Sequence, residues 1–394
     1  MEPFPHIERK DIAVLGGGII GLSAAYAAAT RGGDGVRVRL YEAANVGHSA
    51  ASSSDVSRVF RHLNGPNPLL TSWAIEASSL WDQLSAEGGR PLLRRTGVLF
   101  LAHQDSGVSS WGHHVWPYKS VAQWMDDSSR VLVDKGIPHQ RITPRQLEGI
   151  YPQFQDPTLE EAVLDNTAGF LEAATALETL LDLCLKAGVE YHPNSRVKSI
   201  TSDGDGCTLE LENGPEVKTQ ATVMALNGWT GDLLPFPPGT LALAEQPLIY
   251  LDPRSESSAL ARIPVFISLN TDCYGFPVQD GLLKIANDNP YRPIDHPDQR
   301  KEAENEYVEA VVGTVARFLP AVKDAKVSKT HVCFYDRSRN ELFILDAWDR
   351  DSRVVYGCGM SGRAFKFAPV IGERLARFAV TGRRPEDIES FRLR

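Results

Sequence analysis

The stretch Ile12-Ala-Val-Leu-Gly-Gly-Gly-Ile-Ile-Gly21 lies close to the N-terminus and decides the fold of the chain. Four apolar residues in succession, residues 12–15, predict a strand buried on both faces, as in a parallel sheet. The glycines are spaced as Gly16-x-Gly18-x-x-Gly21, and the alanine-rich run that follows favours a helix. Strand, glycine turn and helix in this order predict a dinucleotide-binding βαβ unit.

Each glycine has a physical role in such a turn. Gly16 permits the tight turn, Gly18 lets a pyrophosphate approach the main chain, and Gly21 lets the helix pack close to the sheet. The first N–H groups of the helix, at Ile19 and Ile20, face the phosphates together with the positive end of the helix dipole. The alternative is a glycine-rich turn in another kind of βαβ unit.

The second strand of the unit supports the dinucleotide interpretation. Residues 37–41 alternate in polarity and lead into Glu42, an acidic residue about 20 positions past the last glycine, where a ribose-binding carboxylate is expected. A carboxylate there accepts hydrogen bonds from the 2′-hydroxyl and repels a 2′-phosphate. The sequence therefore favours FAD or NAD over NADP.

The composition places the chain among ordinary globular proteins. It has 394 residues, 42% hydrophobic and 23% charged, with a net charge of −9, which gives no electrostatic case for nucleic acid or an anionic membrane. No apolar run approaches the ~20 residues that span a bilayer, and the N-terminus lacks a signal-peptide core. Five widely spaced cysteines without a CxxC pair, and no HExxH, indicate neither a disulfide framework nor a metal site. We expect a cytoplasmic monomer, with a peroxisomal location open for a eukaryotic source.

The rest of the chain predicts further strands and helices around this unit. Residues 47–57 are small and polar and suit a loop around a cofactor, and helices are expected near residues 70–84, 172–187, 302–318 and 368–379. Short strands with Asp-Gly and Asn-Gly turns follow residue 189, and the apolar residues 221–226 are expected to rejoin the parallel sheet. The fold class is α/β, a Rossmann-like domain with a second domain inserted into it.

Three separated stretches carry a resemblance to a known family: residues 16–62, residues 274–286 with Tyr-Gly-Phe-Pro and Leu-Lys, and residues 333–372 with Gly-Met-Ser-Gly-Arg-Ala-Phe-Lys-Phe. The chain resembles the D-amino-acid-oxidase superfamily, in particular the branch of monomeric sarcosine oxidase, N-methyltryptophan oxidase, pipecolate oxidase and the fructosyl-amino-acid oxidases (amadoriases). The resemblance covers nearly the whole chain. It implies a discontinuous FAD-binding domain, residues 1–85, 150–232 and 330–394, and an α+β substrate domain on a mixed sheet, residues 86–149 and 233–329.

The resemblance also implies a reaction, in which FAD takes a hydride from the C–N bond of an amine and O2 is reduced to H2O2. Secondary amino acids, N-methyl or cyclic, are the expected substrates, and no side-chain base is needed for a neutral amine. Glycated amino acids are the alternative, as is a flavin oxidase of secondary-metabolite biosynthesis. From other classes, an NAD-dependent dehydrogenase and a non-catalytic dinucleotide-binding protein stay open.

Two residues match the cofactor chemistry of the family. Cys333 matches the cysteine that binds the flavin covalently through sulfur; the alternative is a buried strand cysteine acting as a small hydrophobe. Lys284 matches the lysine that helps activate O2, because an ammonium in a dry site stabilises the anion formed from O2. Its alternative is a solvated lysine on a strand edge.

Further matches describe the substrate and cofactor pockets. Arg61 matches the arginine that binds the substrate carboxylate, a fork suited to two oxygens, and Lys366 matches a second cation for that group as well as a cofactor contact. Tyr274 matches a tyrosine of the substrate pocket, and Arg58 an arginine close to the flavin ring. The remaining cofactor contacts implied are Ser52, Val197, Asn227, Gly228, Gly359, Gly362 and Arg363.

The chain departs from sarcosine oxidase at two positions. Asp288 and Arg363 stand where sarcosine oxidase has histidines, and amadoriases carry an acid near the first of these positions. Asp288 is therefore expected to contact a substrate amine or hydroxyl, and a substrate larger than sarcosine is favoured. Tryptophans at positions 111, 116 and 124 are candidates for lining such a pocket, although tryptophan more often packs in cores and loops.

Overall fold

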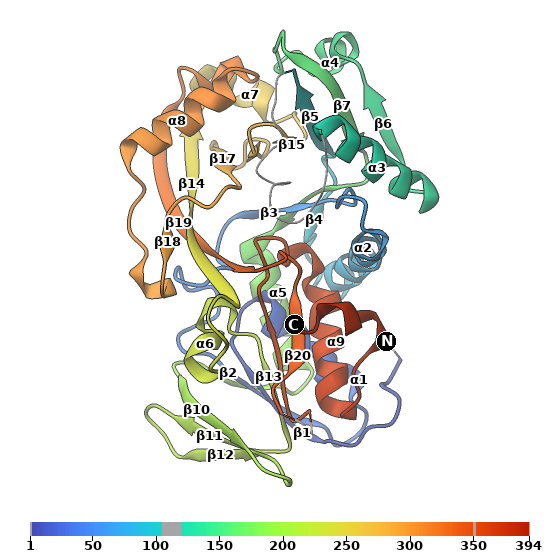
Figure 1. The fold of residues 1–394 in the computed structure, drawn as a ribbon, viewed down its shortest axis with the longest axis vertical. Helices are drawn as coiled ribbons and strands as arrows, with labels where there is room; N and C mark the ends of the chain where they lie inside the picture. The colour runs from blue at the N-terminus through green and yellow to red at the C-terminus, as the bar shows by residue number, and fades with distance from the viewer. Residues whose placement is uncertain (1, 105–119, 350–351, 394) are drawn as a thin grey trace.

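We describe the protein from a computed structural model, in which residues 2–104, 120–349 and 352–393 are described. Figure 1 shows an elongated molecule in which two large sheets lie one above the other, with both chain termini at the lower sheet. Trp111 and Trp116, proposed above as pocket residues, lie outside the described residues.

The lower sheet is the predicted parallel one. It has six strands in the order β20-β21-β13-β1-β2-β9, parallel except for the edge pair β20 and β21. Their bounds are β1 (Asp11–Leu15), β2 (Arg37–Tyr41), β9 (Glu190–His192), β13 (Ala221–Met224), β20 (Ile344–Ala347) and β21 (Val354–Cys358). As predicted, residues 221–224 rejoin this sheet beside β1.

Four helices pack on this sheet and on one another: α1 (Ile19–Arg31), α2 (Pro68–Gly88), α5 (Ala173–Lys186) and α9 (Ala368–Thr381). The close approach of α1 and α9 depends on Gly372, because a Cβ there would lie 2.5 Å from the Cβ of Ser23. Helix α2 begins two residues earlier than predicted, since the Asn67 side chain caps its first N–H groups and Pro68 suits the first turn.

The upper sheet has nine strands. Its order is β18-β14-β17-β16-β15-β5-β7-β6, with β19 paired to β14, and most pairs are antiparallel. The bounds are β5 (Val98–His103), β6 (His139–Ile142), β7 (Leu159–Asp165), β14 (Leu241–Asp252), β15 (Val265–Ser268), β16 (Cys273–Gly275), β17 (Leu283–Asn287), β18 (Pro293–Ile294) and β19 (Lys326–Ser338). The remaining helices are α3 (Val121–Asp134), α4 (Pro144–Ile150), α6 (Thr230–Leu233), α7 (Ser257–Leu260) and α8 (Asn305–Ala316).

Two small sheets complete the fold. Strands β10 (Val197–Ser202), β11 (Cys207–Leu211) and β12 (Glu216–Thr219) form one, below the parallel sheet in Figure 1. The other joins β3 (Ser57–Phe60) and β4 (Leu93–Arg94) to β8 (Gly169–Glu172). The sequence predicted no strand at residues 57–60, and this strand carries Arg58 at the junction of the two large sheets.

The mixed upper sheet agrees with the expected architecture, whereas the predicted domain boundaries stay a prediction. Strand β7 and most of β19 belong to the upper sheet, although the boundaries given above assign both segments to the FAD-binding domain.

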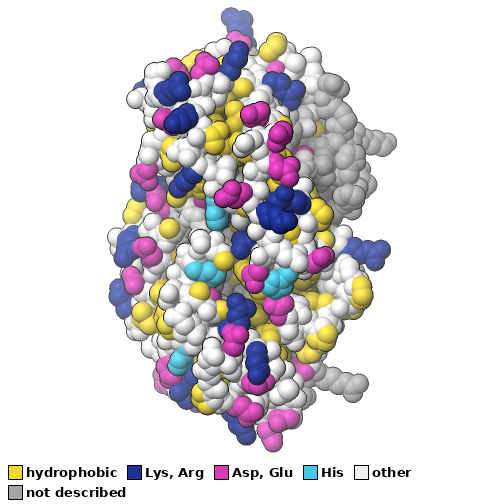
Figure 2. Space-filling view, turned by 90° about the vertical axis from the view of Figure 1, so that its left-hand side faces the viewer, with side chains coloured by type: hydrophobic (Ala, Val, Ile, Leu, Met, Phe, Trp, Pro, Cys, Tyr) yellow, Lys and Arg dark blue, Asp and Glu magenta, His cyan; other side chains and the backbone are white. Residues whose placement is uncertain are grey.

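No helix among the described residues is long and apolar enough to cross a membrane. On the face drawn in Figure 2, acidic and basic side chains are interspersed, without a broad area of one sign.

Candidate active site

A groove runs between the two large sheets and consists of two connected cavities. The smaller lies above the carboxyl ends of β1 and β2 and the larger lies toward the upper sheet, with empty volumes of about 990 Å³ and 1120 Å³ that include space open to solvent. The two cavities share six lining residues: Ile19, Ile20, Ser52, Ser53, Asn227 and Met360. A ligand with two connected parts can therefore lie across both.

The glycine turn forms the floor of the smaller cavity. Gly16 has φ +98°, and a Cβ on it would lie 2.6 Å from the Ala225 carbonyl oxygen. A Cβ on Gly21 would lie 1.8 Å from the Gly16 carbonyl oxygen, so that only glycine lets the helix start this close to the turn. Gly18 lines the cavity. The predicted roles of the three glycines fit this geometry.

Glu42 lies where the ribose-binding acid was predicted, at the end of β2 and in the wall of the smaller cavity. Its carboxylate accepts hydrogen bonds from the N–H of Gly17, at 2.6 Å, and of Ala44, at 2.9 Å. These bonds fix the position of the carboxylate at the edge of the cavity, as the carboxylate of a ribose site requires.

The structure brings most of the predicted cofactor residues to the groove. Those on the smaller cavity are Gly16, Gly18, Ile19, Ile20, Glu42, Ser52, Val197 and Asn227. Those on the larger cavity also include Arg58, Cys333, Gly362, Arg363 and Lys366.

Three predicted cofactor residues, Gly21, Gly228 and Gly359, line neither cavity. Gly21 serves the turn, and a Cβ on Gly228 would lie 2.7 Å from the Phe334 ring. Gly359 has φ +64° and donates its N–H to the buried carboxylate of Asp336 at 2.6 Å. Their role is to shape the walls.

Polar atoms in the wall of the groove fit a large polar cofactor. The Ser57 Oγ and Asn227 Oδ1 atoms are buried and have no hydrogen-bond partner among the described residues. An unsatisfied buried polar atom costs about 1–3 kcal/mol. A ligand that hydrogen-bonds them recovers this free energy, and the glycine turn next to them suits its phosphates.

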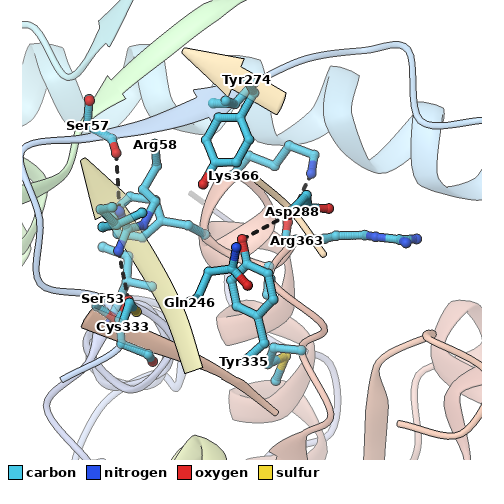
Figure 3. A pocket seen from close by; sticks show the side chains of 18 of the residues that line it. Ser53, Ser57, Arg58, Gln246, Tyr274, Asp288, Cys333, Tyr335, Arg363 and Lys366 are labelled. Carbon is cyan, nitrogen blue, oxygen red and sulfur yellow. Dashed lines mark hydrogen bonds between the residues drawn. The ribbon is translucent and has the colours of Figure 1, made fainter. Parts of the chain in front are cut away.

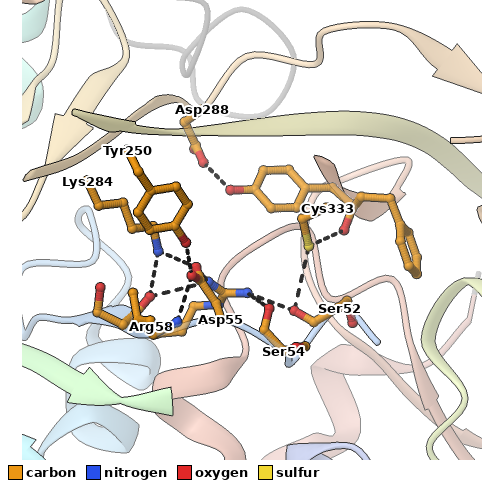
Figure 4. A network of polar contacts seen from close by, with 12 residues as sticks. Ser52, Ser54, Asp55, Arg58, Tyr250, Lys284, Asp288 and Cys333 are labelled. Carbon is orange, nitrogen blue, oxygen red and sulfur yellow. Dashed lines mark hydrogen bonds and ion pairs between the residues drawn. The ribbon is translucent and has the colours of Figure 1, made fainter. Parts of the chain in front are cut away.

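Lys284 lies at the junction of the sheets and is part of a buried ionic network (Figure 4). Its ammonium contacts the carboxylate of Asp55 and donates to the Ser57 carbonyl oxygen at 2.7 Å. The same Asp55 oxygen contacts the guanidinium of Arg58, while the hydroxyl of Tyr250 donates to the other oxygen. The side chain of Asp55 is fully buried. Its carboxylate is shared by two cations, Lys284 and Arg58.

These contacts set the protonation of the network. Burial lowers the pKa of Lys284 to about 8, with Asp55 opposing this effect and Arg58 adding to it. For Asp55, burial favours the neutral acid, but the charges of Lys284 and Arg58 outweigh it and hold the pKa below its usual range. Lys284 therefore lies buried on the larger cavity, not on a solvated edge.

Cys333 lies on β19, with its sulfur 3.6 Å from the Ser52 carbonyl oxygen in the wall of the larger cavity. Burial raises the pKa of its thiol, and the charge of Arg58 counteracts this effect. The thiol lines the cavity, and the charge of the partly buried Arg58 opposes part of the rise in its pKa.

Buried cations gather at the opposite end of the larger cavity (Figure 3). Arg61 and Lys366 are 5% and 4% exposed, and both line the cavity. Burial and the charge of Arg363 lower the pKa of Arg61, and burial together with Arg61 and Arg363 lowers that of Lys366. Asp288 opposes both shifts without cancelling them, so that this end of the cavity favours an anion.

Asp288 and two tyrosines lie next to these cations. Tyr335 donates its hydroxyl to Asp288 at 2.9 Å, and Tyr274 hydrogen-bonds Tyr335. Burial raises the pKa of Asp288, while Arg363 lowers it. In Figure 3, Tyr274, Asp288 and Lys366 converge on one side of the cavity, whereas Cys333 and Arg58 lie on the other.

Sequence reasoning missed several residues of this site, and besides the three glycines it proposed one more residue that lines neither cavity. Trp124 packs on Phe100, with 6.4 Å between ring centroids, and is not part of the cavity wall. The missed residues are Asp55, Gln246, Tyr250 and Tyr335. Tyr335 could have been found by its alternation with Cys333 on one strand; the others carry no local signal.

This fold and groove define a flavoprotein, and the sequence comparison identifies its family. Residues 11–378 match the DAO family, described as FAD dependent oxidoreductase, and the chain belongs to this family. The predicted resemblance, fold class and enzyme class are thereby confirmed, and FAD is the cofactor in place of NAD.

The relatives extend over nearly the whole chain. N-methyl-L-tryptophan oxidase of Yersinia pestis (strain Pestoides F) is 29% identical over 387 residues, which cover 97% of this chain and 98% of the relative. Among solved structures, NikD, an unusual amino acid oxidase essential for nikkomycin biosynthesis, matches with a TM-score of 0.81, 21% identity and coverage of 100% and 98%. Fructosamine oxidase of Aspergillus fumigatus (Amadoriase II) matches with a TM-score of 0.79, 21% identity and coverage of 97% and 89%.

Proposed function

We propose that this chain oxidises a secondary amino acid, N-methyl or cyclic, at its C–N bond. The carbon loses a hydride and the nitrogen a proton to give an imine, and O2 takes up two electrons and two protons to give H2O2. The single observation that carries this proposal is the pair of buried cations, Arg61 and Lys366, in a cavity of an FAD dependent oxidoreductase.

The two cations indicate an anionic substrate, because burial destabilises their charged forms when no anion is bound. Their pKa values are lowered by burial and by neighbouring positive charges. A substrate carboxylate bound between them would remove part of that penalty, and a guanidinium fork binds two oxygens at once. The name of the relative from Yersinia pestis, N-methyl-L-tryptophan oxidase, supports an N-methyl amino acid.

When bound, FAD would supply the redox chemistry that couples oxidation of the amine to reduction of O2. The residues of the chain orient the amine and set the charge around it. Arg61 and Lys366 would hold the carboxylate. Lys284 places an ammonium in the wall of the larger cavity, at the junction of the two sheets. A positive charge there stabilises the anion that forms when O2 accepts an electron.

The FAD is attached covalently through the sulfur of Cys333 in this proposal. Cys333 lines the cavity, and Arg58 favours its thiolate, the form that reacts with carbon electrophiles. After precipitation with trichloroacetic acid, the yellow colour is expected in the pellet for the native chain and in the supernatant for Cys333→Ala. Cys273→Ala, a buried cysteine away from the cavity wall, serves as the matched control and should retain colour in the pellet.

The substrate proposal is tested by H2O2 release across a panel of N-methyl, cyclic and glycated amino acids. Rapid release with N-methyl or cyclic compounds, dependent on the carboxylate, supports it. Faster release with glycated amino acids would assign the second candidate, which Asp288 favours because a carboxylate binds sugar hydroxyls. A colourless protein, or a yellow one that releases H2O2 with none of them, would overturn the proposal.

A monomeric state and a cytoplasmic location stay predictions. Sedimentation of the purified holoenzyme and fractionation of its source cells test them separately.

A further inference from the structure

Gln246 lies deep in the larger cavity and takes no part in the network around Lys284. It belongs to β14, directly opposite Cys333 on β19, and its side chain is 1% exposed. It lines the larger cavity but not the smaller one. Figure 3 places it beside Tyr335 and Asp288, and Asp288 interacts electrostatically with both Arg61 and Lys366.

The orientation of the Gln246 amide is fixed by the main chain. Its Nε2 donates to the carbonyl oxygen of Asn287, and a flipped amide would set two oxygens against each other. The Oε1 atom is therefore the one presented as an acceptor. It has no partner among the described residues, and burying an amide oxygen unsatisfied is unfavourable.

The neighbouring hydroxyl and amide donors have other acceptors, and the ammonium nearby keeps N–H groups for an anion. The hydroxyl of Tyr335 donates to Asp288, and the Asn287 side chain donates to the Thr271 carbonyl oxygen at 2.7 Å. Lys366 donates to the Arg363 carbonyl oxygen at 3.0 Å. The wall thus holds an oriented acceptor beside an anion-binding pair, a pattern that matches the N–H and carboxylate of one amino acid.

We propose that Gln246 accepts a hydrogen bond from the amine N–H of the substrate and thereby selects amino acids that carry one. This inference rests on the proposed function. A neutral secondary amine has one N–H, and donating it to Gln246 fixes the direction of the nitrogen lone pair. A carboxylic acid without N–H leaves Oε1 unsatisfied and is bound more weakly.

The cofactor is the other source of N–H groups that Gln246 could accept. The experiment separates the two sources.

The test compares L-pipecolate with cyclohexanecarboxylate, in which CH2 replaces NH in the same ring. Dissociation constants are measured anaerobically on the holoenzyme, from the concentration dependence of cofactor bleaching for pipecolate and from absorbance changes for cyclohexanecarboxylate. The native enzyme is expected to prefer pipecolate by about tenfold. In Gln246→Met, which keeps the length but removes the acceptor, the preference should fall to about twofold or less.

Leu248→Met is the matched control, since Leu248 lies on the same face of β14 and also lines the larger cavity. It should alter both dissociation constants alike and keep their ratio. Gln246→Glu serves as the second variant: a carboxylate favours the protonated amine, so that pipecolate binding should strengthen at lower pH relative to the native enzyme.

An unchanged ratio of the two dissociation constants in Gln246→Met overturns the inference. So does an altered flavin spectrum or weakened FAD retention with the ratio intact, which would assign the amide to the cofactor. If no amino acid in the panel reduces the enzyme, the proposed function itself fails. If reduction persists and the ratio is unmoved, only the role of Gln246 fails.

Discussion

The two halves of the groove are built on different principles. The smaller cavity is walled mainly by the glycine turn, by residues 41–53 and by short segments at residues 195–197 and 225–233, and its geometry tolerates no added atom at Gly16 or Gly21. The larger cavity is walled by buried charges, such as Lys284, Arg61 and Lys366, drawn from distant segments. The first half should therefore be sensitive to added volume, and the second to lost charge.

The largest effect is expected where volume is added to the first half. In Gly21→Ala, the new Cβ would lie 1.8 Å from the Gly16 oxygen, a clash with main chain that only displacement of the helix can relieve. We expect loss of most bound FAD and a lower yield of folded protein, measured by flavin absorbance per mole of protein.

Gly313→Ala is the matched control, because this glycine lies inside α8 with open space around its Cβ position. Ala is the better helix former, so that stability should rise by up to about 1 kcal/mol and FAD content should stay constant. Equal FAD loss in both variants would show that the turn is not the sensitive element.

The next effect is expected where charge is removed from the second half. Arg61→Met keeps an apolar side chain but removes the guanidinium group. A charge-assisted hydrogen bond contributes about 1.5–3 kcal/mol. We expect kcat/KM to fall roughly 10- to 150-fold for an amino acid, with FAD retained.

The amide of the same substrate shows whether Arg61 acts on the carboxylate. The native enzyme should oxidise the amide poorly, and Arg61→Met should lower that residual rate little. A similar loss for acid and amide would place Arg61 outside carboxylate binding.

The contrast between the halves also explains what the sequence could predict. The glycine turn and Glu42 were found because each lies within one βαβ unit, whose spacing follows from local geometry. Lys284, Cys333 and Arg61 were found only through the resemblance to a family, and the structure brings all three to one cavity.

Residues without a local pattern could not be found in this way. Asp55 sits in a run of small polar residues and meets Lys284, 229 positions away, only in the folded chain. Gln246 lies beside Glu245 in a mostly apolar strand and belongs to no recognisable motif. Strand β3 was missed because its pairing with β8 is non-local.

A smaller effect is expected when the carboxylate of the ionic network is neutralised. Asp55 raises the pKa of Lys284 against burial, which leaves it at about 8 in the native chain. The ammonium is the form that assists O2, so that the rate should fall as pH rises through this value. In Asp55→Asn the pKa drops further, and the decline should move to lower pH.

Stopped-flow mixing of the anaerobically reduced holoenzyme with O2 measures this profile, and anaerobic reduction by substrate serves as the internal control. We expect the oxidation rate to shift its midpoint by one pH unit or more, with the reduction rate changed less. An unmoved midpoint would mean that another group than Lys284 titrates.

The smallest effect is expected at Tyr250, which touches the same carboxylate with a neutral group. Tyr250→Phe keeps the ring and removes only the hydroxyl that donates to Asp55. A neutral hydrogen bond contributes about 0.5–1.5 kcal/mol, so that the free energy of unfolding should fall by about 1 kcal/mol in guanidinium titrations. The pH dependence of the oxidation rate with O2 should stay near that of the native chain, because Lys284 and Arg58 still hold Asp55 ionised. A midpoint that moved as far as in Asp55→Asn would show that hydrogen bonding, and not charge, organises this half of the groove.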